Sequence, residues 1–152
     1  MRKRNAKKKI RDDTAKRKPK PTRRRAVVNK KVRNAKVTVR DGVTFRSGLE
    51  AFAHDLLIEN NIPHTYEETI IQLIPPFVYG DEKIRAATYK PDFVGDGWIM
   101  EIKGFATDVF KLRWKLFKYT LAKQGIHHRL YLPRNQQEVR EAIQDILSNM
   151  KT

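Results

Sequence analysis

The residues best suited to chemistry lie in one short stretch, in which Asp92 precedes a Glu101-Ile102-Lys103 sequence. The Asp96-Gly97 dipeptide between two apolar runs predicts a two-residue hairpin turn. Such a turn would place Asp92 directly opposite Glu101, with their Cβ atoms roughly 4.5–5.5 Å apart on one face. Strand alternation puts Lys103 on the same face, about 6–7 Å further along.

Two carboxylates at this spacing repel each other, and a divalent cation between them would remove the repulsion. Oxygen ligands suit Mg²⁺, with Mn²⁺ able to substitute, so the pattern predicts a metal site at Asp92 and Glu101. Two other interpretations stay open. The hairpin is an ordinary surface hairpin whose acids are neutralised by Lys103, or a bulged turn places Asp92 opposite Met100 instead.

The chemistry that these residues support is hydrolysis of phosphodiester bonds. Asp92 and Glu101 would hold the metal, which polarises the scissile phosphate and lowers the pKa of a bound water. Lys103 would orient the attacking water and stabilise the additional negative charge of the transition state. The chain has no cysteine, which excludes disulfides, thiolate zinc sites and cysteine nucleophiles. Metal-assisted hydrolysis requires none of them.

Glu50 is a fourth candidate, and two roles compete for its carboxylate. The Ser47-Gly48-Leu49-Glu50 sequence matches the S-x-x-E capping box, in which Ser47 caps a helix and Glu50 returns a hydrogen bond. The local sequence alone favours the cap over a metal-site role. One carboxylate does not easily serve both, so the two roles can be separated by experiment.

The spacing from Pro91-Asp92 to Glu101-x-Lys103 matches the signature of the PD-(D/E)XK nucleases. With further segments upstream, the chain from about Val43 to Gly104 resembles bacteriophage endonuclease I, a family that resolves four-way (Holliday) DNA junctions. The segments that carry the resemblance are Phe45-Arg-Ser-Gly-Leu-Glu50, Tyr66-Glu-Glu68, Tyr89-x-Pro-Asp-Phe93 and Glu101-x-Lys-Gly104.

This resemblance implies a metal-dependent DNA endonuclease with Glu50, Asp92 and Glu101 as its acidic catalytic and metal-binding residues and Lys103 as its catalytic lysine. It also implies a homodimer whose protomers exchange a strand, with residues 72–79 in the segment between the two lobes. The chain departs from the family in its basic N-terminal arm, its unmatched C-terminal half and the longer stretch over residues 78–88.

These departures leave strand exchange and the preference for junctions open. Another nuclease of the same superfamily, of the mismatch-repair or transposon-end-cutting type, is one alternative. A non-catalytic basic protein that binds or packages DNA is the alternative from a different class.

Positive charge is concentrated near the N-terminus. Residues 1–40 contain 19 of the 33 Lys and Arg residues and two of the 17 acids, a net charge of +17; the remaining 14 basic and 15 acidic residues give −1. Residues 1–36 are therefore predicted to be a disordered DNA-binding arm, ahead of a nuclease domain over residues 37–152. A targeting or solubilising tail is the alternative. The expected phosphate contacts are Arg23, Arg24, Arg25, Lys30 and Lys31.

The rest of the chain predicts an α/β fold of order α-β-β-β-α-β-α. The resemblance makes this the PD-(D/E)XK core, a mixed central sheet flanked by helices. Helices are expected from Ser47 to Asn60, from Thr107 to about Lys123 and from Gln136 to Met150. Strands are expected over residues 65–73, 87–94, 98–103 and 129–132.

The expected helix after Gly104 carries Lys111, Lys115 and Lys118 on one stripe. The stripe would face DNA phosphates, although a solvated face explains it nearly as well. The aromatic residues on another face of this helix are expected to belong to the core, and no histidine is assigned a role. The chain has no apolar run of about 18 residues and no visible signal sequence, so we expect a cytoplasmic protein whose partner is DNA and not a membrane.

Overall fold

The computed structural model describes residues 36–150. Contacts divide the chain into two units, Met1–Lys31 and Val32–Thr152, and the described residues all belong to the second. The expected phosphate contacts at residues 23–25, 30 and 31 lie outside the described residues, so they stay predictions. The second unit is a mixed α/β structure with three helices and several small sheets among its described residues.

The central sheet has four strands in the order β10-β9-β8-β3. Strand β8 (Phe93–Gly95) pairs antiparallel with both β3 (Thr65–Tyr66) and β9 (Trp98–Met100). Strand β10 (Arg129–Tyr131) pairs parallel with β9. The sheet therefore contains both parallel and antiparallel pairs, as expected from the mixed central sheet that the family resemblance implies.

The β8–β9 hairpin has the predicted register, with Phe93 opposite Met100 and Gly95 opposite Trp98. The Asp96-Gly97 turn needs a left-handed residue, which Gly97 supplies with φ +72°. Gly95 is also required, because a Cβ atom there would collide with the indole of Trp98. No bulge interrupts this hairpin, so the bulged alternative is wrong.

The three helices are the predicted ones: α1 (Gly48–Glu59), α2 (Asp108–Lys123) and α3 (Gln136–Met150). Ser47 caps α1 and Thr107 caps α2, each by accepting a hydrogen bond from the backbone N–H three residues later. Within residues 36–150, no helix has the length and apolar character needed to span a membrane.

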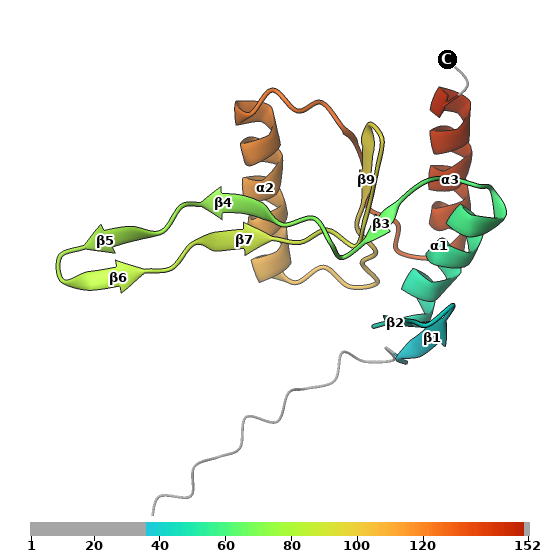
Figure 1. Ribbon diagram of the computed structural model, residues 1–152, viewed down its shortest axis with the longest axis horizontal. Coiled ribbons are helices and arrows are strands. Elements are labelled where there is room, and N and C mark those ends of the chain that lie inside the picture. The colour runs from blue at the N-terminus through green and yellow to red at the C-terminus, as the bar shows by residue number, and fades with distance from the viewer. Residues whose placement is uncertain (1–35, 151–152) are drawn as a thin grey trace, which may run out of the picture. The chain divides into compact units, whose positions relative to one another are not determined.

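Helices cover both faces of the sheet (Figure 1). Trp98 and Met100 belong to a core with residues of α1 and α3, whereas Ile99 points to the other face and packs with Phe117 and Leu121 of α2. All three residues of β9 are buried, which is typical of a strand covered on both sides. The predicted core role of the α2 aromatic face is confirmed.

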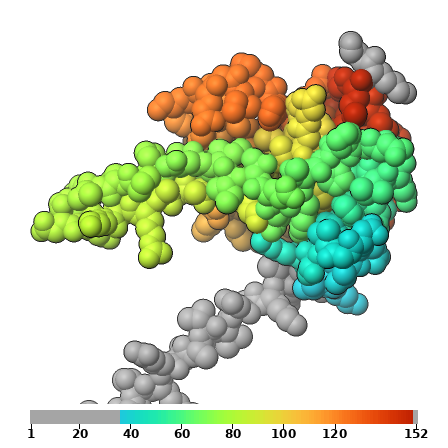
Figure 2. Space-filling view, viewed as in Figure 1, coloured from blue at the N-terminus to red at the C-terminus, as the bar shows by residue number. Residues whose placement is uncertain are grey.

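Two hairpins that the sequence analysis did not predict accompany this core. Strands β1 (Thr38–Arg40) and β2 (Val43–Phe45) form the first. In the second, β4 (Ile71–Ile74) pairs with β7 (Ala87–Tyr89), and β5 (Phe77–Tyr79) pairs with β6 (Glu82–Ile84) further out. This two-stranded ribbon extends away from α2 as a narrow projection (Figures 1 and 2).

Three strand predictions are wrong in their extent. The expected strand over residues 98–103 is shorter, because β9 ends at Met100. The expected strand over residues 65–73 is two strands, β3 and β4, because the backbone turns at Glu67, which has φ +49°. The expected strand over residues 87–94 is likewise two, β7 and β8, because the chain leaves the ribbon at Lys90-Pro91 before it enters the central sheet. Proline cannot donate a ladder hydrogen bond and favours such a break.

Candidate active site

Asp92 and Glu101 lie at the open end of the β8–β9 hairpin, one residue beyond the last pair of the ladder. The two residues are 9% and 7% exposed. The backbone N–H of Ile102 donates a 2.7 Å hydrogen bond to Oδ2 of Asp92, which attaches this carboxylate to the opposite strand. The parallel ladder continues on the far side, where Glu101 N–H donates to Tyr131 O at 3.0 Å and Lys103 N–H to Pro133 O at 3.0 Å.

Burial and mutual repulsion make both carboxylates hard to ionise. Burial, with the nearby charge of Glu101, raises the pKa of Asp92 to about 8 against the hydrogen bond from Ile102. Burial also raises the pKa of Glu101, although Lys103 opposes this effect. The charge of Glu50 acts in the same direction on both acids. Three acidic side chains therefore influence one another here, which costs stability unless positive charge is supplied.

Lys103 supplies part of that charge. Its Nζ atom lies 3.8 Å from Oε1 of Glu101 and 4.8 Å from the ring centroid of Phe110 on α2. The side chain is 35% exposed, so the ammonium group has access to solvent and to a bound substrate. The predicted proximity of Lys103 to Glu101 is confirmed.

Glu50 is held by the start of α1 as the capping box predicts. Ser47 Oγ accepts the Glu50 N–H at 3.2 Å and donates to Glu50 Oε1 at 2.8 Å, and the backbone N–H of Arg46 donates to Oε2 at 3.0 Å. Tyr66 adds a fourth contact, its hydroxyl donating to Oε2 at 2.7 Å. The carboxylate is buried all the same, beside the two acids whose pKa it raises.

The donor set fits a hard divalent cation in two respects. All the acidic donors are carboxylates, and Oε2 of Glu101 is buried without a hydrogen-bond partner among residues 36–150. Such an atom is costly unless a ligand satisfies it. No group of three Asp, Glu or His side chains in the described part of the chain already has the spacing of a metal cage. Asp92 and Glu101 would thus form the preformed part of the site, with Glu50 held beside them.

Three neighbours of the site escaped the sequence analysis or were given another role. Tyr66 was assigned no role in the site, yet its hydroxyl donates to Glu50. Tyr89 ends β7 and faces Glu101, and Phe110 lies under Lys103. Both tyrosines lie within the segments that carry the family resemblance, but no local spacing rule pairs either with its glutamate. Glu67 links the Asp92 backbone to the chain that precedes α1. Its N–H donates to Asp92 O at 2.9 Å, and its carboxylate lies 2.8 Å from Nη2 of Arg46.

The predicted DNA-contacting lysines of α2 are all exposed. Lys111 forms an ion pair with Asp108 at 3.0 Å, which reduces its availability for DNA phosphates.

The structure brings together two histidines that were assigned no role: Nδ1 of His54 lies 3.1 Å from Nε2 of His64. Burial and His64 lower the pKa of His54, and the pair packs between Phe45 and Phe93 as part of the core.

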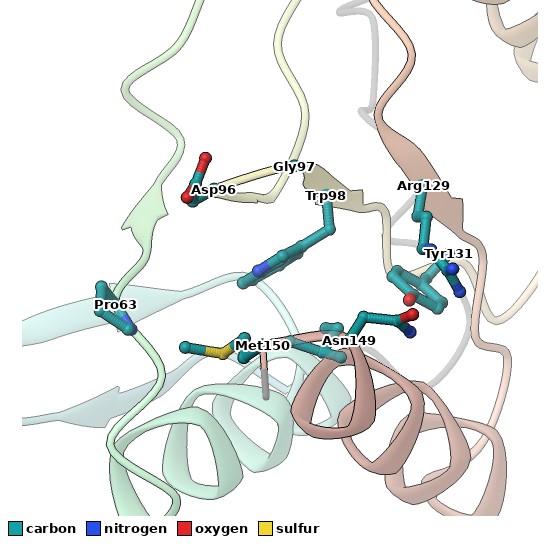
Figure 3. A pocket seen from close by; sticks show the side chains of 9 residues that line it. Pro63, Asp96, Gly97, Trp98, Arg129, Tyr131, Asn149 and Met150 are labelled. Atoms are coloured by element: carbon teal, nitrogen blue, oxygen red, sulfur yellow. The ribbon is translucent and has the colours of Figure 1, made fainter. Parts of the chain in front are cut away.

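A hollow of about 390 Å³ lies at the other end of the hairpin, around the Asp96-Gly97 turn (Figure 3). Trp98, Arg129 and Asn149 contribute to its wall. Three strand residues separate this turn from the acids, a distance on the order of 10 Å. The hollow contains none of the predicted catalytic residues, and its arginine is already paired with Asp145 at 3.2 Å.

A scan against protein-family models gives no match, and searches of curated proteins and of solved structures give no significant match either. The residues and their geometry therefore carry the functional argument.

Proposed function

We propose that this chain is a metal-dependent DNA endonuclease of the PD-(D/E)XK type that resolves four-way junctions as a homodimer. The observation that carries the proposal is the hairpin register, which brings Asp92 and Glu101 together in a buried position with Lys103 beside them. A protein that used these acids only for solubility would leave them exposed. Their burial, with an unpartnered oxygen on Glu101, favours a functional site over a surface hairpin.

Asp92 and Glu101 would hold Mg²⁺ or Mn²⁺. The chemistry that this ion supplies when bound is polarisation of the scissile phosphate and a lower pKa for water. Lys103 would then orient the attacking water and stabilise the negative charge that develops on the phosphate. The Phe110 ring lies beneath the Lys103 ammonium group, and the hydrogen bond from Ile102 fixes Asp92, so both groups are positioned before substrate binds.

The homodimer is supported by the projecting ribbon. Strand β5 exposes Phe77, Val78 and Tyr79 by 47%, 65% and 77%. A two-stranded ribbon alone is marginal in water, and clustered exposed apolar side chains indicate a contact surface. A second copy related by two-fold symmetry would cover them and supply the second active site that paired cuts across a junction require. The outgoing strands β4 and β5 overlap residues 72–79, which the family resemblance assigns to the bridge between lobes, whereas β6 lies in the stretch over residues 78–88 where the chain departs from the family.

The substrate preference is tested by incubating the purified full chain with labelled four-way junctions, mismatched duplexes and plain duplexes in the same Mg²⁺ buffer and salt. Paired, symmetric cuts in the junction with little cutting of the plain duplex support the proposal. Preferential cutting of mismatched duplexes assigns the chain to another activity of the superfamily. Tight binding with no cutting in Mg²⁺ or Mn²⁺ leaves the non-catalytic alternative.

A further inference from the structure

We propose that Tyr89 is a positioning residue whose buried hydroxyl group holds the Glu101 carboxylate for cation binding. This inference rests on the proposed function and adds a residue outside the Asp92, Glu101 and Lys103 set. The starting observation is a pair of buried polar atoms without partners. Within the described part of the chain, the Tyr89 hydroxyl and Oε2 of Glu101 are the buried side-chain polar atoms that have no hydrogen-bond partner.

The two side chains influence each other directly. The phenol faces Glu101 closely enough for each group to affect the ionisation of the other, yet no well-formed hydrogen bond joins them or satisfies either atom elsewhere in residues 36–150. A buried hydroxyl or carboxylate oxygen without a partner costs about 1–3 kcal/mol. Two such atoms, in side chains that influence each other and in residues only 4% and 7% exposed, indicate a site that is completed when a ligand binds.

The ring of Tyr89 is held rigidly, so its hydroxyl group has a fixed position. It stacks on Phe117 with a centroid distance of 4.6 Å and an interplanar angle of 25°, and lies 5.9 Å from Trp114. The Arg113 guanidinium lies 5.7 Å from the ring, while its Nη2 donates to Thr88 O at 2.7 Å. The aromatic face of α2 thus fixes the phenol, and the strand pairing of β7 with β4 fixes its backbone.

A phenol suits this position because it is a neutral donor. Lys103 also contacts Glu101, but its positive charge offsets the negative charge that attracts a cation. Tyr89 can donate to one lone pair of Glu101 without reducing that charge, and so set which lone pair faces Asp92. Tyr66 already makes such a hydrogen bond, since its hydroxyl donates to Glu50 at 2.7 Å, whereas the Tyr89 hydroxyl has no partner within residues 36–150. Outer partners of this kind typically contribute 10- to 100-fold in metal affinity or activity.

The test compares Tyr89→Phe with wild type and with Tyr131→Phe. Tyr131→Phe is the matched control because it also removes a tyrosine hydroxyl, one that donates at 2.6 Å to the exposed Asp145. The readouts are the Kd for Mn²⁺ measured on the DNA-free chain by calorimetry, kcat and KM on a labelled junction, and the melting temperature without metal.

We expect Tyr89→Phe to weaken Mn²⁺ binding and lower kcat by about 10- to 100-fold, with KM for the junction unchanged. Its metal-free melting temperature should equal or exceed that of wild type, because an unpartnered buried hydroxyl is removed while the ring stays. Tyr131→Phe should change neither Mn²⁺ binding nor kcat.

Two results overturn the inference alone: wild-type Mn²⁺ affinity and kcat in Tyr89→Phe, or a melting temperature several degrees lower with losses no greater than that instability explains. A wild-type chain that binds Mn²⁺ but cuts no DNA overturns the proposed nuclease function. The role of Tyr89 is then decided by whether Tyr89→Phe binds Mn²⁺ more weakly than wild type. A wild-type chain that binds no Mn²⁺ overturns both.

Discussion

Oδ2 of Asp92 accepts the backbone N–H of Ile102 at 2.7 Å, so the first acid of the site is attached to the strand segment that carries the second acid and the lysine. Asparagine keeps an oxygen that can accept this hydrogen bond, but it carries no charge. Replacing Asp92 by Asn therefore separates what the carboxylate does for the fold from what its charge does.

The first prediction concerns stability without metal. The pKa of Asp92 is near 8 in the folded chain and has its ordinary value of 3.8 when unfolded, so the folded state binds the extra proton between these values. Stability from this group is fully present below pH 4 and is lost as the pH rises through 8. The melting temperature of wild type relative to Asp92→Asn should therefore fall by several degrees from pH 5 to pH 9, without metal.

The comparison with Asp92→Asn is needed because the titration of His54 changes the stability of the folded chain with pH in the opposite direction. Its lowered pKa makes the folded state less stable as the pH falls below about 6.5. This contribution is common to both proteins and cancels in the difference. A difference that stays constant across this range would contradict the buried, protonated state of Asp92.

The second prediction separates cutting from binding at Lys103. Lys103→Met keeps an unbranched side chain but removes the ammonium group that lies over Phe110, so kcat on a junction should fall by about 10²–10³-fold. Junction affinity, measured by gel shift in Ca²⁺, should change by less than about threefold, because most of the positive charge lies elsewhere in the chain. Lys123→Met, at the end of α2, is the control. A loss of junction affinity with an unchanged kcat would make Lys103 a DNA-binding residue only.

The third prediction decides between the two roles of Glu50. Glutamine can satisfy the same neighbours, accepting from Arg46 and Tyr66 and donating to Ser47, so Glu50→Gln should keep the melting temperature within about 3 °C. If the charge serves the metal site, cleavage should fall by at least about tenfold. Wild-type cleavage would leave Glu50 as a helix cap.

A matched control for Glu50 lies at the start of α3. Glu138 accepts the Arg134 N–H at 2.9 Å, and its own N–H donates to Asn135 at 3.0 Å, which is the same capping arrangement away from the acids. Glu138→Gln should leave both cleavage and stability close to wild type.

The fourth prediction concerns the ribbon. Replacing Phe77 and Tyr79 by Ser should weaken a ribbon-mediated dimer at least tenfold in Kd, about 1.4 kcal/mol, because both exposed aromatic rings would be lost from the interface. Sedimentation velocity over a concentration series measures this change. Ile58→Ser, an exposed apolar position on α1, is the control. A wild-type chain that stays monomeric, or a double variant that dimerises normally, would contradict the dimer contact.

Local signals in the sequence predicted the helices and the hairpin that positions the acids. Ser47 and Thr107 cap helices by contacts within three residues, and the Asp96-Gly97 turn sets the register of β8 and β9 by itself. The same signal could have located two further hairpins. Asp41-Gly42 joins β1 to β2, and Gly80-Asp81 joins β5 to β6, each between short runs with strand character.

The other features of the site could not be predicted, because they depend on contacts between residues far apart in the sequence. Glu67 adopts φ +49°, which a glutamate rarely does, and its N–H is satisfied by Asp92 O, 25 residues later. The pairings of Tyr66 with Glu50 and of Tyr89 with Glu101 likewise require the folded sheet. Burial of the acids likewise requires the assembled sheet and helices, which no spacing rule contains.

The most direct test of the nuclease is cleavage of a labelled four-way junction by wild type and by Asp92→Asn in Mg²⁺, resolved on a denaturing gel. We expect wild type to make paired cuts near the branch point, and Asp92→Asn to cut at least about 100-fold more slowly while it binds the junction and melts normally. Wild type that cuts no DNA in Mg²⁺ or Mn²⁺, or Asp92→Asn that cuts at the wild-type rate, would contradict the account.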